Sequence, residues 1–261
     1  MVKSRKKILF LLLFLLTIGS NTAQNPFAQA YLDSGISDFN IGNYPKAIAH
    51  FNACVQSAKK SEHLKLLSNA YNNLGNCYAN TGKSIDALKN YQLSVSIAEK
   101  IHDTTRLAKT LKNIGTVYSE QKDFSMALKF YERALQLAQR IKDSSILADC
   151  YNNQGVVYEQ QFEYEKAANI YTKALAIYKA EGNEERISMS LNNLGIVYKY
   201  LKDYAASIQN YEEALSLAEK TGDKFMIAAT INNLGGVYLL KNEAQKALTL
   251  FTQALSIARQ I

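Results

Sequence analysis

A glycine recurs at intervals of forty residues through almost the whole chain. The members of this row are Gly35, Gly75, Gly115, Gly155, Gly195 and Gly235. A tyrosine follows three residues after each glycine except the first, where Asp38 takes that place. Six copies of one sequence unit predict a chain of stacked supersecondary repeats, each burying its apolar face against its neighbours.

Each repeat also carries a small residue and an aromatic residue at fixed distances from its glycine. Twelve residues after the glycine stand Ala47, Ala87, Ala127, Ala167, Ser207 and Ala247, and sixteen after it stand Phe51, Tyr91, Tyr131, Tyr171, Tyr211 and Phe251. Apolar residues recur every three or four positions in two blocks per repeat, and short polar stretches such as 81–83 separate the blocks. This pattern predicts two helices per repeat, joined by a turn.

Segment 71–78 reads Tyr-Asn-Asn-Leu-Gly-Asn-Cys-Tyr, and Ala87 and Tyr91 follow it at the spacings given above. This pattern resembles the tetratricopeptide repeat (TPR) family from about residue 28 to residue 261. The resemblance implies an all-α fold, a right-handed α-solenoid superhelix of six helix-turn-helix TPR units. The expected units span about 27–64, 65–104, 105–144, 145–184, 185–224 and 225–261.

The forty-residue period differs from the usual TPR period of about 34 residues. We expect the extra residues to fall in the second helix of each repeat and in the connection after it. Repeats of this length resemble those of kinesin light chain and of adaptors built on Leu-Gly-Asn repeats. Similar arrays occur in many exported bacterial proteins of the sensor kinase and regulator type.

The first residues of the chain follow a different pattern. Four basic side chains precede an apolar run at 8–16, and small or polar residues follow at 17–23. This layout predicts a secretory signal peptide at 1–23, ahead of a solenoid at 24–261, and so an exported protein on the periplasmic or extracellular side of the membrane. An uncleaved N-terminal anchor and a spurious extension are the alternatives. The apolar run is shorter than the ~20 residues of a membrane span, and we expect no transmembrane span in the mature segment.

Charge gives no support for a nucleic-acid partner. The leader holds four basic and no acidic residues, so its removal lowers the formal net charge from +7 to +3. A small residual charge spread along a solenoid lacks the dense basic surface that nucleic-acid binding requires. We therefore expect this segment to bind no nucleic acid.

The cysteines and the motif search give no indication of catalysis or metal binding. Cys54, Cys77 and Cys150 occupy positions filled by small or apolar residues in other repeats, which predicts buried free thiols, although one disulfide is left open. The histidines are isolated, and Gly82-Lys83-Ser84 lacks the preceding glycine of a phosphate-binding loop. We expect no enzyme activity, no cofactor and no metal. The row Asp103, Asp143, Asn183 and Asp223 is expected to cap helix N-termini or to form turns.

The TPR resemblance implies that the first helices of the repeats line a concave groove. Asparagine stands two residues before the glycine in repeats two to six, and a polar side chain also precedes each of these asparagines. The predicted peptide-binding residues are Asn72, Asn73, Asn76, Lys109, Lys112, Asn113, Asn152, Asn153, Asn192, Asn193, Lys199, Asn232 and Asn233. A carboxamide can pair with both the N–H and the C=O of an extended peptide. The alternative is that these asparagines only bond to the neighbouring helix.

In TPR relatives that bind a C-terminal carboxylate, Lys or Arg joins the asparagine at neighbouring groove positions, and the resemblance implies this role for Lys109 and Lys112. Later repeats carry Asp149, Met189 and Ala229 at the place of Lys109, and this argues against such a clamp.

The leading functional hypothesis is a non-enzymatic scaffold that binds a peptide or protein in its groove. The alternative is the extracytoplasmic sensory or assembly region of a longer membrane-bound signalling protein, of the histidine kinase or transcriptional regulator type. The apolar residues near Ile261 lack the polar cap that terminal repeats usually need. This predicts end-to-end self-association through the last helix or continuation of the chain beyond Ile261.

Overall fold

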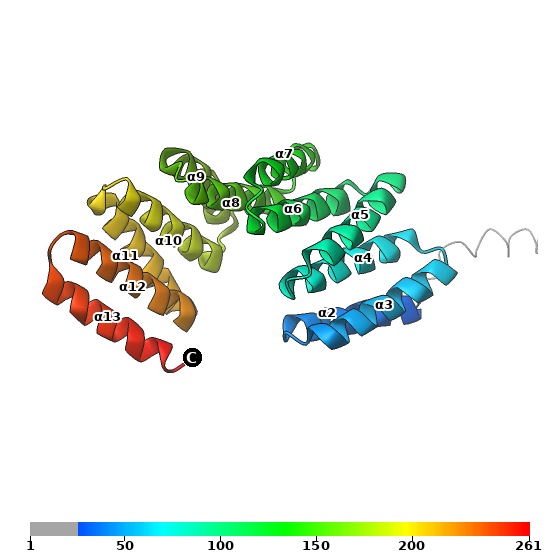
Figure 1. Ribbon diagram of the computed structural model, residues 1–261, viewed down its shortest axis with the longest axis horizontal. Helices are drawn as coiled ribbons and strands as arrows, with labels where there is room; N and C mark the ends of the chain where they lie inside the picture. The colour runs from blue at the N-terminus through cyan, green and yellow to red at the C-terminus, as the bar shows by residue number, and fades with distance from the viewer. Residues whose placement is uncertain (1–25) are drawn as a thin grey trace, which may run out of the picture. The chain divides into compact units, whose positions relative to one another are not determined.

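A computed structural model describes residues 26–261, and the predicted leader lies outside this range. The described residues form twelve α-helices in sequential antiparallel pairs, which confirms the all-α class and six helix-turn-helix repeats (Figure 1). The first helices are α2 (Pro26–Asn40), α4 (Leu64–Asn80), α6 (Thr104–Glu120), α8 (Ser144–Gln160), α10 (Glu184–Tyr200) and α12 (Lys224–Leu240). The second helices are α3 (Tyr44–Lys60), α5 (Ser84–Lys100), α7 (Phe124–Ile141), α9 (Tyr164–Glu181), α11 (Tyr204–Thr221) and α13 (Ala244–Ala258).

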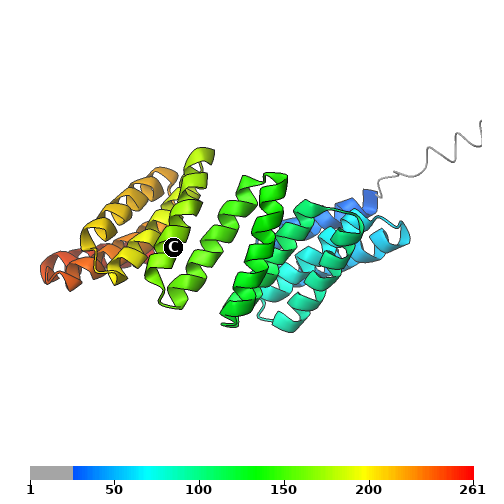
Figure 2. The same cartoon turned by 90° about the horizontal axis from the view of Figure 1, so that it is seen from above.

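The helices gather into two compact bodies. Helices α2 to α5 belong to the N-terminal body, which ends at Ile101, and α6 to α13 belong to the C-terminal body, His102–Ile261. Within each body, each helix packs against the next one along the chain, and Figure 2 shows the helices lying alongside one another. None of the described helices is both long enough and apolar enough to cross a lipid bilayer.

The predicted helix caps are confirmed. The side chains of Asp103, Asp143, Asn183 and Asp223 each accept a hydrogen bond from the backbone N–H three residues later, at 2.9 to 3.2 Å. These bonds satisfy donors that have no partner inside the helix, so they fix where α6, α8, α10 and α12 begin. His63 caps α4 in the same way through Nδ1.

The expected position of the extra residues was wrong. From α4 to α11, the first helices have 17 residues and the second helices 17 or 18, and a new helix begins every twenty residues. The two helices of a pair bury a shared face, so a second helix lengthened alone would leave part of its apolar face uncovered. The longer repeat is therefore divided equally between both helices.

The recurring glycine packs directly against the aromatic ring of the second helix in its repeat. A Cβ atom on Gly195 would lie 2.5 Å from Tyr211 Cε1, and one on Gly75 would lie 2.4 Å from Tyr91 Cε1. Both tyrosines are buried. The glycine row and the aromatic row found in the sequence are therefore two sides of one contact.

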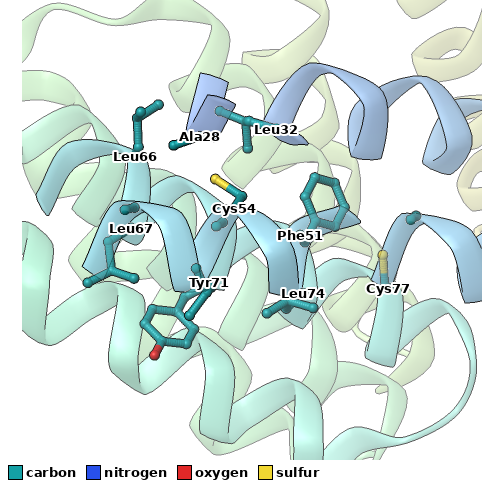
Figure 3. Close-up of a cluster of buried hydrophobic side chains, with 13 residues drawn as sticks. Ala28, Leu32, Phe51, Cys54, Leu66, Leu67, Tyr71, Leu74 and Cys77 are labelled. Carbon is teal, nitrogen blue, oxygen red and sulfur yellow. The ribbon is translucent and has the colours of Figure 1, made fainter. Parts of the chain in front are cut away.

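The three cysteines are buried free thiols, as predicted from their repeat positions. Cys54 and Cys77 pack among aliphatic and aromatic side chains of the N-terminal body (Figure 3). Burial raises the pKa of Cys54 and of Cys77 to about 11, and that of Cys150 to about 12. The reactive species is the thiolate, so all three are inert packing residues at neutral pH.

The glycine contact makes a prediction for two alanine substitutions in neighbouring repeats. Gly195→Ala places a methyl group against buried Tyr211 and is expected to destabilise the protein by about 1–3 kcal/mol. Gly236→Ala lies inside α12, where a Cβ would have no atom within 4 Å other than those of the adjacent helix backbone, and is expected to stabilise by roughly 0.5–1 kcal/mol. Urea unfolding followed by circular dichroism measures both. Shifts of the same sign would contradict the contact.

Candidate functional site

The C-terminal body contains an open groove of about 480 Å³. Its walls come from the first helices α6, α8, α10 and α12, and from the end of α9. The lining residues are Lys112, Asp149, Asn152, Asn153, Tyr178, Glu185, Arg186, Met189, Asp223 and Met226. Because first helices of four successive repeats contribute, the repeat architecture itself creates the groove.

Asp149 is the centre of the charges in this groove. Its Oδ2 atom lies 2.7 Å from Lys112 Nζ of α6, and its Oδ1 atom pairs with Arg186 Nη1 of α10. The Tyr178 hydroxyl lies 3.5 Å from Asp149 Oδ1, and the Arg186 guanidinium lies 5.4 Å from the centre of the Tyr178 ring. The Asp149 carboxylate therefore links three successive first helices, α6, α8 and α10. The Tyr178 hydroxyl of α9 lies next to the same carboxylate.

Partial burial would by itself raise the pKa of Asp149, but the charges and hydrogen bonds of Lys112 and Arg186 outweigh it and hold this pKa below its usual range. Asp149 is therefore ionised at neutral pH and pairs with both cations, and the three groups together keep a net charge of +1. Lys112 is engaged within the protein, while exposed Lys109 does not line the groove. This pairing agrees with the sequence argument against a carboxylate clamp.

Part of the asparagine row bonds to the preceding repeat. Asn193 Nδ2 donates to Asn152 Oδ1 at 3.4 Å, and Asn233 Nδ2 donates to Asn192 Oδ1 at 3.1 Å. Asn153 Nδ2 donates to Thr116 Oγ1 at 3.3 Å. The alternative considered from sequence was a bond to the neighbouring helix. It accounts for one of the two polar atoms, nitrogen or oxygen, in each of these side-chain amides.

Two of these side-chain amides, those of Asn152 and Asn153, keep one polar atom that bonds to no other residue described. Asn152 and Asn153 both line the groove, and within residues 26–261 neither Asn152 Nδ2 nor Asn153 Oδ1 has a hydrogen-bond partner. Two adjacent residues thus offer the groove one donor and one acceptor. An extended peptide carries the complementary C=O and N–H on its backbone.

The structure brings three of the thirteen predicted residues, Lys112, Asn152 and Asn153, into this groove. The other predicted residues of the C-terminal body do not line it, and they are Lys109, Asn113, Asn192, Asn193, Lys199, Asn232 and Asn233. Asn72, Asn73 and Asn76 belong to α4 of the N-terminal body, where Asn76 Oδ1 accepts a hydrogen bond from the Tyr91 hydroxyl at 2.7 Å. The use of these ten residues in ligand binding stays a prediction.

Sequence reasoning missed Tyr178, Glu185, Arg186, Asp223 and Met226 as groove residues. One signal was present, because Tyr178 interrupts a row of alanines at the same repeat position, Ala58, Ala98, Ala138, Ala218 and Ala258. A large side chain at a place reserved for small ones marks a local departure from the repeat. Here that departure coincides with the groove.

A second, apolar groove of about 550 Å³ lies between α12 and α13, and Asn232 lines it. Phe225 and Leu255, which also line it, are 71% and 52% exposed. The predicted self-association through the last helix stays a prediction. Among residues 26–261, no cluster of His, Cys, Asp or Glu side chains could hold a metal ion.

The pairing of Asp149 predicts a pH-dependent contribution to stability. Because its pKa is lowered on folding, Asp149 stabilises the protein above its unfolded pKa of about 4, and this contribution is lost as the pH falls through the lowered value. Asp149→Asn should therefore destabilise by about 1–3 kcal/mol at pH 7 and by progressively less below pH of about 4. Urea unfolding across this pH range measures the difference. Asp203→Asn, which keeps a capping oxygen on α11, is the control. A deficit that does not change with pH would contradict the role of this carboxylate.

Comparison with known proteins agrees with the repeat architecture. The tetratricopeptide repeat profile matches residues 26–100, 66–140, 106–180 and 186–260. No curated protein matches the chain in sequence.

Three solved structures illustrate the similarity. BtubC (BKLC) from P. vanneervenii is 20% identical with a TM-score of 0.66, and the match covers 92% of each chain. Kinesin light chain repeats of P. anserina are 15% identical with a TM-score of 0.62, covering 73% of this chain and 94% of theirs. A Rap protein in complex with Competence and Sporulation Factor is 14% identical with a TM-score of 0.69, covering 90% of this chain and 75% of its own. These identities show a shared fold, and together with the profile matches they show that the chain belongs to the tetratricopeptide repeat family.

Proposed function

We propose that this chain is a non-catalytic scaffold that binds an extended peptide, or an extended segment of a protein, in the groove of its C-terminal body. The observation that carries the proposal is the pair formed by Asn152 Nδ2 and Asn153 Oδ1. These atoms are a donor and an acceptor on adjacent groove residues, without partners in the described part of the chain. The Rap protein of similar fold, solved with Competence and Sporulation Factor, supports a binding role for such a scaffold.

Side-chain bonds between neighbouring repeats also hold the walls of the groove together. Asp149 joins α6, α8 and α10, and the Asn193 amide joins α10 to Asn152 of α8. A site whose walls are already fixed loses less conformational entropy when it binds, so more of the interaction energy appears as affinity. The sensory or assembly region of a longer signalling protein, the second hypothesis, would use the same groove.

The proposal predicts that the purified chain binds members of a random peptide library, and that the two groove carboxamides contribute to affinity. Asn152→Ala combined with Asn153→Ala removes both unused polar groups. This change should weaken binding of a selected peptide by about 10- to 100-fold, which corresponds to roughly one or two hydrogen bonds. Fluorescence anisotropy of a labelled peptide measures the dissociation constant.

Asn210→Ala is the matched control, because it truncates an asparagine of α11 whose amide donates to Ala206 O of the same helix and which does not line the groove. It should preserve most of the affinity. Equal losses in the control and in the double variant would mean that the carboxamides act only through packing. Failure to select any peptide would overturn the proposed function.

We also propose that the protein is exported, on the strength of the leader pattern at 1–23. Expression in a bacterial host should yield an extracytoplasmic product whose first residue follows the small residues at 17–23. N-terminal sequencing of that product tests this. Recovery of the intact N-terminus in the cytoplasm would contradict export.

A further inference from the structure

The charges that line the groove are not balanced. Both of its cations, Lys112 and Arg186, are paired with Asp149. Two other lining residues, Glu185 and Asp223, are exposed, and neither is paired with a basic side chain within residues 26–261. Two cations and three carboxylates give the groove lining a net charge of −1, and the two carboxylates without a basic partner are the ones exposed to a ligand.

Each unpaired carboxylate stands one helical turn from a methionine in the same groove. Glu185 and Met189 are four residues apart on α10, and Asp223 and Met226 are three residues apart at the start of α12. Glu185 and Met189 share a face of α10, and Asp223, the N-cap of α12, accepts a hydrogen bond from the Met226 N–H. Both methionines are half-buried and line the groove, so each of the two helices presents a carboxylate beside an apolar surface.

Methionine suits a binding surface that must fit side chains of different shape. It is unbranched and polarisable, and it adapts to irregular apolar partners. Carboxylates at an exposed rim favour cationic partners and repel anionic ones, and they act most strongly on selectivity and on association rate.

We propose that the groove selects peptides in which a Lys or Arg side chain stands close to an apolar side chain. The cation pairs with Glu185 and Asp223, and the apolar side chain packs on Met189 and Met226. Asn152 and Asn153 hold the peptide backbone between them. This inference rests on the proposed peptide-binding function and adds to it the chemistry of the ligand.

The two carboxylates differ in how they can be tested without harming the fold. Asp223 accepts a hydrogen bond from the backbone N–H of Met226 at 3.0 Å and so caps α12. Asn183 makes the equivalent cap on α10 as an asparagine, so Asp223→Asn removes the charge and keeps the cap. Glu185→Gln is isosteric.

The test uses acetylated and amidated peptides of one sequence, so that their termini carry no charge. A basic residue of a peptide chosen from the library is kept as Lys, or replaced by Gln or by Glu. The Lys peptide should bind about 3- to 30-fold more tightly than the Gln peptide, the Glu peptide should bind weakest, and salt should reduce the preference.

The double variant Glu185→Gln with Asp223→Asn should lose the preference for Lys over Gln while keeping its affinity for the Gln peptide. Glu132→Gln removes one charge from the exposed face of α7 and should change neither. Equal binding of the three peptides, or a preference that survives in the double variant, would overturn the charge selection and leave peptide binding standing. Failure of every peptide to bind would overturn the proposed function itself.

Discussion

The structure depends on the contact between the glycine of each first helix and the aromatic ring of the following second helix. A ring atom occupies the space that a Cβ atom would take at Gly35, Gly75, Gly155 and Gly195, with distances of 2.4 to 2.5 Å. Glycine inside a helix lowers its stability by roughly 1 kcal/mol relative to alanine, so the contact must return more than this. A fully buried tyrosine such as Tyr171, whose hydroxyl donates to Glu159, does so through the apolar area that it removes from water. Repeating the contact fixes the spacing of each helix pair, and the rest of the architecture follows from it.

The hydroxyl end of the same aromatic row bonds to polar side chains of the first helices. Tyr91 donates to Asn76 and Tyr131 donates to Thr116, both one residue after the glycine, at 2.7 and 3.2 Å. Val156 cannot accept in the next repeat, and Tyr171 donates instead to Glu159 at 3.0 Å. Where Gly236 follows the glycine in the last repeat, the aromatic residue is Phe251 and no hydroxyl needs a partner. Polar residues of the first helices therefore serve the core as well as the surface, and their presence alone does not identify a ligand site.

Because polar residues of the first helices serve both the core and the surface, the sequence predicts the fold better than the ligand site. Helix pairs, caps and buried thiols follow from residues that repeat, because the same contact is made in each copy, as for Asp143 on α8. The groove depends on residues that do not repeat. Tyr178 stands in an alanine row, and Asp149 stands where the previous repeat has Lys109. Averaging over repeats hides such residues, and their pairing with Arg186 joins side chains from different repeats whose rotamers no spacing rule specifies. The equal lengthening of both helices was also missed, since no motif residue lies in the added turns.

The sequence left open whether the asparagine row stabilises the fold or binds a ligand. In Asn152 and Asn153, one polar atom of the amide bonds to another repeat and the other is available to a ligand. At Asn152 the oxygen accepts from the next repeat, and at Asn153 the nitrogen donates to the previous one. Each bond holds its carboxamide in one orientation, and that orientation decides which remaining atom reaches the groove. The structural bond therefore prepares the binding group: without it the amide could rotate, and the donor and acceptor would lose their fixed order along the groove. A ladder of bonds between repeats and a ladder of contacts to a peptide are compatible, because a carboxamide has enough donors and acceptors for both.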